Sequence, residues 1–144
     1  MKVLDVNVLL YAVNEDAPHH DAARAWLESA MAGRETVALT WIVLLAFLRL
    51  STRVAVFPQC LTIEQAVQVV DTWLSLPTVV IVQPTSRHWV TLRDLLLSAG
   101  TSGNLTSDTH LAAIAIEHGA ELCSTDHDFA RFPALRWVNP LAAK

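Results

Sequence analysis

The sequence is short of cysteine and of charged residues, and each shortage excludes a class of protein. Its two cysteines, Cys60 and Cys123, stand far apart with no C-x-x-C spacing, so neither a zinc ribbon nor a disulfide framework is expected. Charged residues make up 17% of the chain, and the formal net charge is −4. A general basic field for polyanions is therefore absent, and any nucleic acid must be bound by a local patch or through a metal ion.

Long hydrophobic runs are also absent. The longest, from Trp41 to Leu48, has eight residues, whereas a helix that spans a bilayer needs roughly 20. We therefore expect no transmembrane segment. The opening residues place Asp5 and Asn7 where a signal peptide needs an apolar core, which favours a cytoplasmic protein.

Short apolar runs alternate with segments of helical period. Residues 3–6 and 79–82 lack polar alternation, which is typical of strands covered on both faces. Two more strands are expected at 121–124 and around 137–138. Helices are expected near Val6, before Gly33, over 41–50, after Thr62, from 86 to Gly100 and from Asp108 to Gly119. This order predicts a single domain over residues 1–144 with an α/β fold, a three-layer α/β/α sandwich around a mostly parallel central sheet.

Four aspartates lie where strands end and helices begin. Asp5 follows the first strand among apolar neighbours, where an uncompensated charge is costly. Asp108 opens a helix, and Asp126 and Asp128 follow directly on the strand at 121–124. Taken alone, each has a simpler explanation: Asp5 and Asp108 fit helix N-caps, and the other two fit a polar turn.

The joint arrangement of these aspartates favours a metal site. In a parallel sheet the carboxyl ends of the strands and the amino ends of the following helices lie along one edge, so Asp5, Asp108 and Asp126 converge there. Clustered carboxylates repel one another unless a cation compensates, and Mg²⁺ and Mn²⁺ prefer such oxygen ligands. A metal ion held by carboxylates activates water at a phosphodiester, so hydrolysis of a nucleic-acid backbone is the expected chemistry. The carboxylates alone do not separate RNA from DNA.

Three motifs, in order along the chain, resemble those of the PIN domain, specifically the VapC-type toxins of toxin–antitoxin pairs. They are LDVNVLLYA at residues 4–12, LTSDTHLAAIA at 105–115 and LCSTDHDF at 122–129, with Phe132 after the third. The resemblance spans nearly the whole chain. It implies a PIN-like α/β/α sandwich and an endoribonuclease that depends on Mg²⁺ or Mn²⁺ and cuts RNA used in translation.

The resemblance also implies roles and partners. A cognate VapB-like antitoxin, an RNA substrate and a homodimer are expected. The implied site residues are the metal-binding acids Asp5, Asp108 and Asp126, with Asp128 as an additional or water-mediated contributor and Asn7 and Thr125 as polar supports.

One position departs from the family pattern. PIN domains usually carry a second acid, commonly Glu, on the helix after the second strand. In the corresponding segment, residues 41–49, Ala46 occupies that place, and no acid occurs between Glu35 and Glu64. The sequence leaves open a site for one ion, weak binding, a ligand borrowed from the substrate or from another loop such as that of Asn104, and full loss of activity.

Arginines and tryptophans offer further candidates. Arg49 and Arg53 are predicted to share one helix face, where they either contact substrate phosphates or are solvated. The helix at 41–50 is apolar all round, which fits burial in the core or against a second subunit. The tryptophans fit either the core, which is favoured for each, or a groove that receives an antitoxin helix: Trp26, Trp41, Trp73, Trp89 and Trp137.

Two other functions compete with the nuclease hypothesis. A PIN-like module without the helix acid could bind RNA or a regulatory protein without cutting anything. A Mg²⁺-dependent signalling receiver also gathers aspartates at the carboxyl edge of a parallel sheet. It fits less well, because the first strand lacks paired acids and the only lysines are Lys2 and Lys144, neither of them at a late strand end.

Overall fold

A computed structural model describes residues 1–100 and 103–142 of the chain. Five short strands form one sheet, in the order β3-β2-β1-β4-β5, and every neighbouring pair is parallel. The strands are β1 (Lys2–Leu4), β2 (Val37–Leu39), β3 (Val79–Ile81), β4 (Glu121–Cys123) and β5 (Arg136–Val138).

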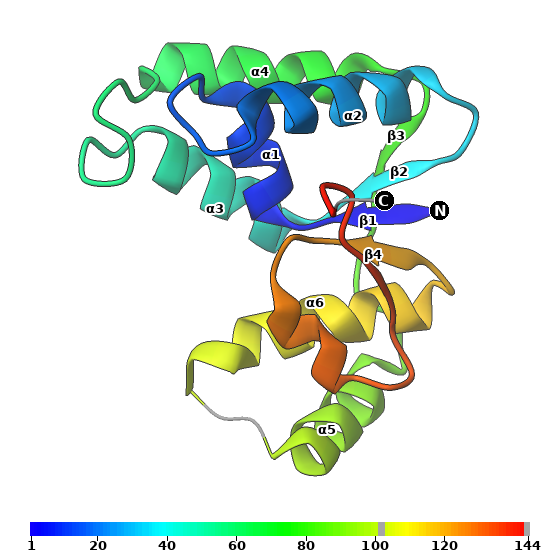
Figure 1. Cartoon of the computed structure of the whole chain (residues 1–144). Helices are drawn as coiled ribbons and strands as arrows, with labels where there is room; N and C mark the ends of the chain where they lie inside the picture. Colours follow the sequence, from blue (N-terminus) through cyan, green and yellow to red (C-terminus); the bar gives the residue numbers. More distant parts are fainter. Residues whose placement is uncertain (101–102, 143–144) are drawn as a thin grey trace.

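Helices cover both faces of the sheet, which confirms the three-layer α/β/α prediction. Figure 1 shows α1 to α4 on one side of the strands and α5 and α6 on the other. Over residues 1–100 and 103–142, no helix has the length and apolar character to cross a membrane. The helices are α1 (Val6–Val13), α2 (His20–Ala32), α3 (Trp41–Ser51), α4 (Ile63–Ser75), α5 (His88–Ala99) and α6 (Thr106–Glu117), with the 3₁₀ turns η1 (Gly103–Leu105) and η2 (His127–Arg131).

The central strand β1 lies between β2 and β4. Its residues Leu4 and Val3 pair with Cys123 and Leu122 of β4, so both strands end at the same edge of the sheet. The chain runs outward from β1 in one direction through β2 and β3 and in the other through β4 and β5. Ligands of parallel α/β sheets bind at the carboxyl edge at such a reversal of strand order.

Capping side chains determine several element boundaries. The first strand ends at Leu4 rather than residue 6, because the Asp5 carboxylate accepts the N–H of Val6 and begins α1. The predicted capping box of α4 is confirmed, since Thr62 and Gln65 each accept the other's backbone N–H.

Around α6 the structure corrects one boundary. The helix begins at Thr106, after η1, so Asp108 lies in its first turn and is not its N-cap. Residues 101–102 of the predicted loop between Gly100 and Thr106 lie outside the described part of the chain.

The core is built from apolar side chains of the sheet and the inner helix faces. Phe47, Val43 and Leu44 of α3 are buried, but Trp41 and Leu45 are 49% and 62% exposed. The apolar helix is therefore buried on one face only. The core prediction for the tryptophans holds for Trp73, which is buried, and is wrong for Trp41 and for Trp89, which is 64% exposed.

A chain of hydrogen bonds fixes α5 against α6. The carboxylate of Glu117, near the end of α6, accepts the backbone N–H and the hydroxyl of Thr85. Its second oxygen lies 2.6 Å from Nδ1 of His88, whose Nε2 lies 2.8 Å from Nδ1 of His110. These contacts hold α6, which carries Asp108, in a defined position under the sheet.

Candidate metal centre

Three aspartates from two segments meet at the carboxyl edge of the sheet. Asp108 comes from the first turn of α6, Asp126 from the residue before η2, and Asp128 from η2 itself. One carboxylate oxygen of each lies within 4.8 Å of the others, close enough for one cation to contact all three. Asp126 and Asp128 are brought close by the tight turn after β4, in which the Asp126 carboxylate accepts the N–H of Asp128 at 2.9 Å.

Asp5 lies beside these three carboxylates rather than among them. Its side chain is buried, with 7% exposed. One oxygen accepts the Val6 N–H at 2.8 Å, and the other accepts the hydroxyl of Ser124 at 2.7 Å. Asp5 is thus the helix N-cap that the simpler explanation predicts, and it also contributes negative charge at the site.

Ser124 connects the two strands at the site, and it was missed by the sequence analysis. Its buried hydroxyl donates to Asp5 and accepts the backbone N–H of Asp126 at 3.0 Å and the amide group of Asn7 at 3.3 Å. The Asn7 side chain also accepts the N–H of Thr125 at 3.4 Å. A serine between an apolar strand and the Asp-x-Asp turn is the signal that could have pointed to it.

The predicted supports Asn7 and Thr125 contribute differently. Asn7 binds both Ser124 and the backbone of Thr125, so its amide holds the segment after β4 close to α1. Thr125 takes part through its backbone N–H, and its side chain makes no hydrogen bond in the described part of the chain.

Burial and mutual repulsion disfavour ionisation of the buried acids. Burial is the main cause that raises the pKa of Asp5, and the charge of Asp126 adds to it. The pKa of Asp108 is raised to about 6, first by burial and then by the charges of Asp5, Asp126 and Asp128. Only the guanidinium of Arg131 opposes this rise. A divalent cation would relieve the repulsion, and the donor set consists of the carboxylate oxygens that hard cations prefer.

A small cavity of about 90 Å³ separates Asp5 and Asp108 from α3. Ala46 lines it together with Ile42 and Val43 of the same helix. Ala46, which the sequence comparison with the family pattern puts in place of the helix acid, therefore lines the same cavity as two of the predicted metal-binding acids.

The two predicted phosphate-binding arginines do not share a helix face. Arg49 is exposed in the last turns of α3, but that helix ends at Ser51. Arg53 lies beyond it in a turn, where its carbonyl accepts the N–H groups of Val56 and Phe57. Because Arg53 lies outside α3, the predicted shared helix face is wrong. Neither arginine forms an ion pair within residues 1–100 and 103–142, and their role in binding substrate stays a prediction.

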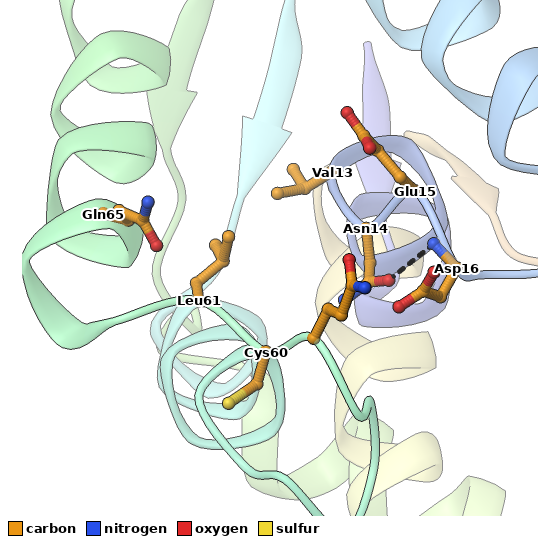
Figure 2. Close-up of a pocket in the computed structure, with 8 residues that line it drawn as sticks. Val13, Asn14, Glu15, Asp16, Cys60, Leu61 and Gln65 are labelled. Atoms are coloured by element: carbon orange, nitrogen blue, oxygen red, sulfur yellow. Dashed lines mark hydrogen bonds between the residues drawn. The ribbon is translucent and has the colours of Figure 1, made fainter.

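The larger cavities lie away from the acid cluster. One of about 300 Å³ sits where α1 ends, and Figure 2 shows the Asn14 side chain accepting the N–H of Asp16 at its edge. It contains none of the predicted site residues, and its lining consists of Val13, Asn14, Glu15, Asp16, Gln59, Cys60, Leu61 and Gln65. A second cavity of about 300 Å³ is mainly apolar and lies between α2 and α4, where Leu27, Met31, Trp73 and Leu76 line it.

An α/β/α sandwich with a cluster of aspartates at the carboxyl edge of a parallel sheet is the architecture that the resemblance to the PIN domain implies. The model of the PIN domain matches residues 2–135, and the chain belongs to that family. It is 47% identical to Ribonuclease VapC37 of Mycobacterium tuberculosis over 142 residues, 99% of each chain. It is 40% identical to Ribonuclease VapC33 of the same organism, over 98% of this chain and 99% of that one. The resemblance to VapC-type proteins is thereby confirmed.

Solved structures share the fold at lower identity. VapBC2 from Rickettsia felis, bound to a DNA fragment from its promoter, has a TM-score of 0.71 at 24% identity and covers 96% of this chain and 97% of its own. VapC20 of Mycobacterium tuberculosis, a toxin that cleaves the sarcin-ricin loop, has a TM-score of 0.71 at 16% identity, with 94% and 98% covered. At these identities the likeness concerns the fold alone.

Proposed function

We propose that this protein is a Mg²⁺- or Mn²⁺-dependent endoribonuclease and the toxin of a toxin–antitoxin pair that cuts RNA used in translation. The observation that carries the proposal is the group of three carboxylates, from Asp108, Asp126 and Asp128, within 4.8 Å of one another. These three residues would hold the ion, with Asp5 adding negative charge beside them. The similarity to two proteins named as ribonucleases supports RNA as the substrate.

The bound ion and the residues around it have different roles in the proposed reaction. A bound divalent ion supplies Lewis-acid polarisation of the phosphodiester and an activated water. Ser124 and Asn7 hold the segment after β4 in position, because they bind the backbone of Asp126 and Thr125. Asp108, with its pKa raised to about 6, exchanges a proton near neutral pH and loses it when a cation binds.

The proposed partners follow from the relatives and from apolar surface. Solved relatives include toxin–antitoxin complexes, among them one from Klebsiella pneumoniae and VapBC-1 from nontypeable Haemophilus influenzae. We propose a VapB-like antitoxin for this chain, with the apolar cavity between α2 and α4 as a place for one of its side chains. The exposed side chains of Trp41 and Leu45 on α3 support a homodimer, because apolar surface of this kind is covered when two subunits associate. A cytoplasmic location fits an RNA substrate.

Metal titration followed by RNA cleavage tests this function. Calorimetry with Mn²⁺ and with Mg²⁺ on antitoxin-free protein should show binding that is lost in Asp126→Asn. Cleavage of single-stranded RNA should require the ion and stop when a chelator is added. Binding and cleavage that persist in Asp126→Asn, or cleavage that persists in chelator, would contradict the proposal.

A second candidate function, a binding module without catalysis, is favoured by Ala46. Its methyl group leaves the cavity beside Asp5 and Asp108 without the usual helix acid. We expect Ala46→Glu to raise Mn²⁺ affinity at least about tenfold, the scale on which even outer-shell partners change metal affinity. If the parent binds RNA without cutting it and Ala46→Glu restores cleavage, the binding module is the correct function. If the parent protein cleaves RNA, the nuclease function holds. Ala46→Gln is the uncharged control for Ala46→Glu.

A further inference from the structure

The short turn η2 places the positively charged side chain of Arg131 beside the acid cluster. Nε of Arg131 donates to the backbone carbonyl of Asp128 at 3.1 Å, and Nη2 approaches its carboxylate at 3.4 Å. The side chains of Arg131 and Asp128 are 37% and 49% exposed, and an ion pair this exposed contributes little to stability. A contribution of this ion pair to folding stability therefore does not explain the presence of an arginine at position 131.

The geometry of Arg131 suits a phosphate. A guanidinium has five N–H donors in a planar fork, and in the described part of the chain only Nε and Nη2 of Arg131 are engaged. The remaining donors are free for a second, bidentate partner. Because the surrounding groups are carboxylates, a polyanion that reaches this site meets the positive charge of Arg131, which already acts on Asp108.

An aromatic pair includes His127, which belongs to the same turn η2 as Arg131. His127, between Asp126 and Asp128, is exposed, and its ring centroid lies 5.5 Å from that of Trp137 at an interplanar angle of 80°. The indole N–H of Trp137 donates to the carbonyl of Ser124 at 2.9 Å. Trp137 is thus fixed by the residue that binds Asp5, and it supports the His127 ring in an edge-to-face contact.

We propose that Arg131 and His127 form a nucleotide-binding edge of the acid cluster, in which Arg131 binds a backbone phosphate of single-stranded RNA and His127 stacks on a base. This inference rests on the proposed function and adds the residues that hold the substrate. Unpaired bases stack on aromatic rings with little dependence on sequence, and arginine binds phosphate through its fork. Trp137 is a positioning residue, because it acts through His127.

RNA binding tests the proposal separately from cleavage. The probe is a fluorescein-labelled, single-stranded RNA dodecamer of mixed sequence, and every variant carries Asp108→Asn so that the probe is not cut. We expect Arg131→Gln to weaken binding about tenfold, as loss of one charge-assisted contact does. The slope of log affinity against log salt should fall in magnitude by about 0.7, the value for one phosphate on a single strand.

The aromatic contact has its own variants. His127→Ala should weaken binding at least about fivefold and leave the salt slope unchanged, whereas His127→Phe, which keeps a ring, should retain affinity. Arg24→Gln is the matched control, because Arg24 forms the same kind of exposed ion pair, with Glu28 on α2, and should change neither quantity. Thermal unfolding of each variant separates loss of contact from loss of fold.

The outcomes are distinct. An unchanged salt slope in Arg131→Gln, equal losses in the two His127 variants, or no RNA binding at all would overturn the inference. If the protein without Asp108→Asn binds the probe but never cuts RNA, the proposed nuclease function fails. The effects of Arg131→Gln and His127→Ala on affinity would still support the nucleotide-binding edge.

Discussion

Replacing Asp108 by asparagine should slow RNA cleavage by about 10³-fold, because Lewis-acid catalysis is worth several kcal/mol and each ~1.4 kcal/mol is about tenfold in rate. Asp108 is one of the three residues whose oxygens lie within 4.8 Å of one another, and the amide keeps its shape while it removes the charge. The measurement is the initial rate of cleavage of a labelled RNA at saturating Mn²⁺.

Two further variants make this result specific. Asp126→Asn should cause a loss of similar size, since it removes another member of the group of three. Asp71→Asn, at an exposed position on α4, should cleave at the rate of the parent. Activity of Asp108→Asn close to that of the parent would show that the carboxylate cluster is not the catalytic site.

The same substitution, Asp108→Asn, should make the metal-free protein more stable. The folded pKa of Asp108 is about 6, against 3.8 for an ordinary aspartate, so the folded state binds this proton more tightly than the unfolded state. The stability due to the proton is fully present below pH 3.8 and is lost as pH rises to about 6. Asparagine does not ionise, so the variant escapes this loss.

The expected gain is modest in size and clear in its pH dependence. The shift from 3.8 to about 6 corresponds to at most about 3 kcal/mol, and because Asp108 is only half-buried we expect about 2 kcal/mol after solvent screening. Urea unfolding in chelator should show the variant more stable than the parent above pH 6, with the difference shrinking toward pH 3.8. A variant less stable than the parent above pH 6 would show that Asp108 is not under electrostatic strain.

The convergence of the aspartates could be predicted because it depends on sheet topology. Strands without polar alternation indicate a parallel sheet, and a parallel sheet brings the residues after β1 and β4 to one edge. That reasoning placed Asp108 and Asp126 together. It chose Asp5 as the third member and kept Asp128 as an additional contributor, whereas the group within 4.8 Å contains Asp128. That difference depends on hydrogen bonds: the Asp5 carboxylate is bound by Val6 and Ser124, and the N–H of Asp128 donates to the Asp126 carboxylate.

Other details depend on contacts that periodicity does not contain. The apolar pattern predicted a helix over 41–50, close to α3 as observed, but the spacing of four between Arg49 and Arg53 was interpreted as helical although Arg53 lies beyond that range. Hydrophobicity likewise could not distinguish Trp73, which packs against Phe47 with ring centroids 4.8 Å apart, from the exposed Trp89. Arg131 was overlooked because its proximity to the aspartates comes from one 3₁₀ turn.

The bond between Ser124 and Asp5 has a consequence for the timing of synthesis. These residues are 119 positions apart in the chain, yet the site needs both, since Asp126 and Asp128 are positioned by the segment after β4. While the ribosome is still making the residues before β4, β1 has no partner on that side and the carboxylates cannot gather. On the proposed function, a nascent chain would therefore have no assembled nuclease site until almost the whole protein has been translated, which leaves time for the antitoxin to be present first.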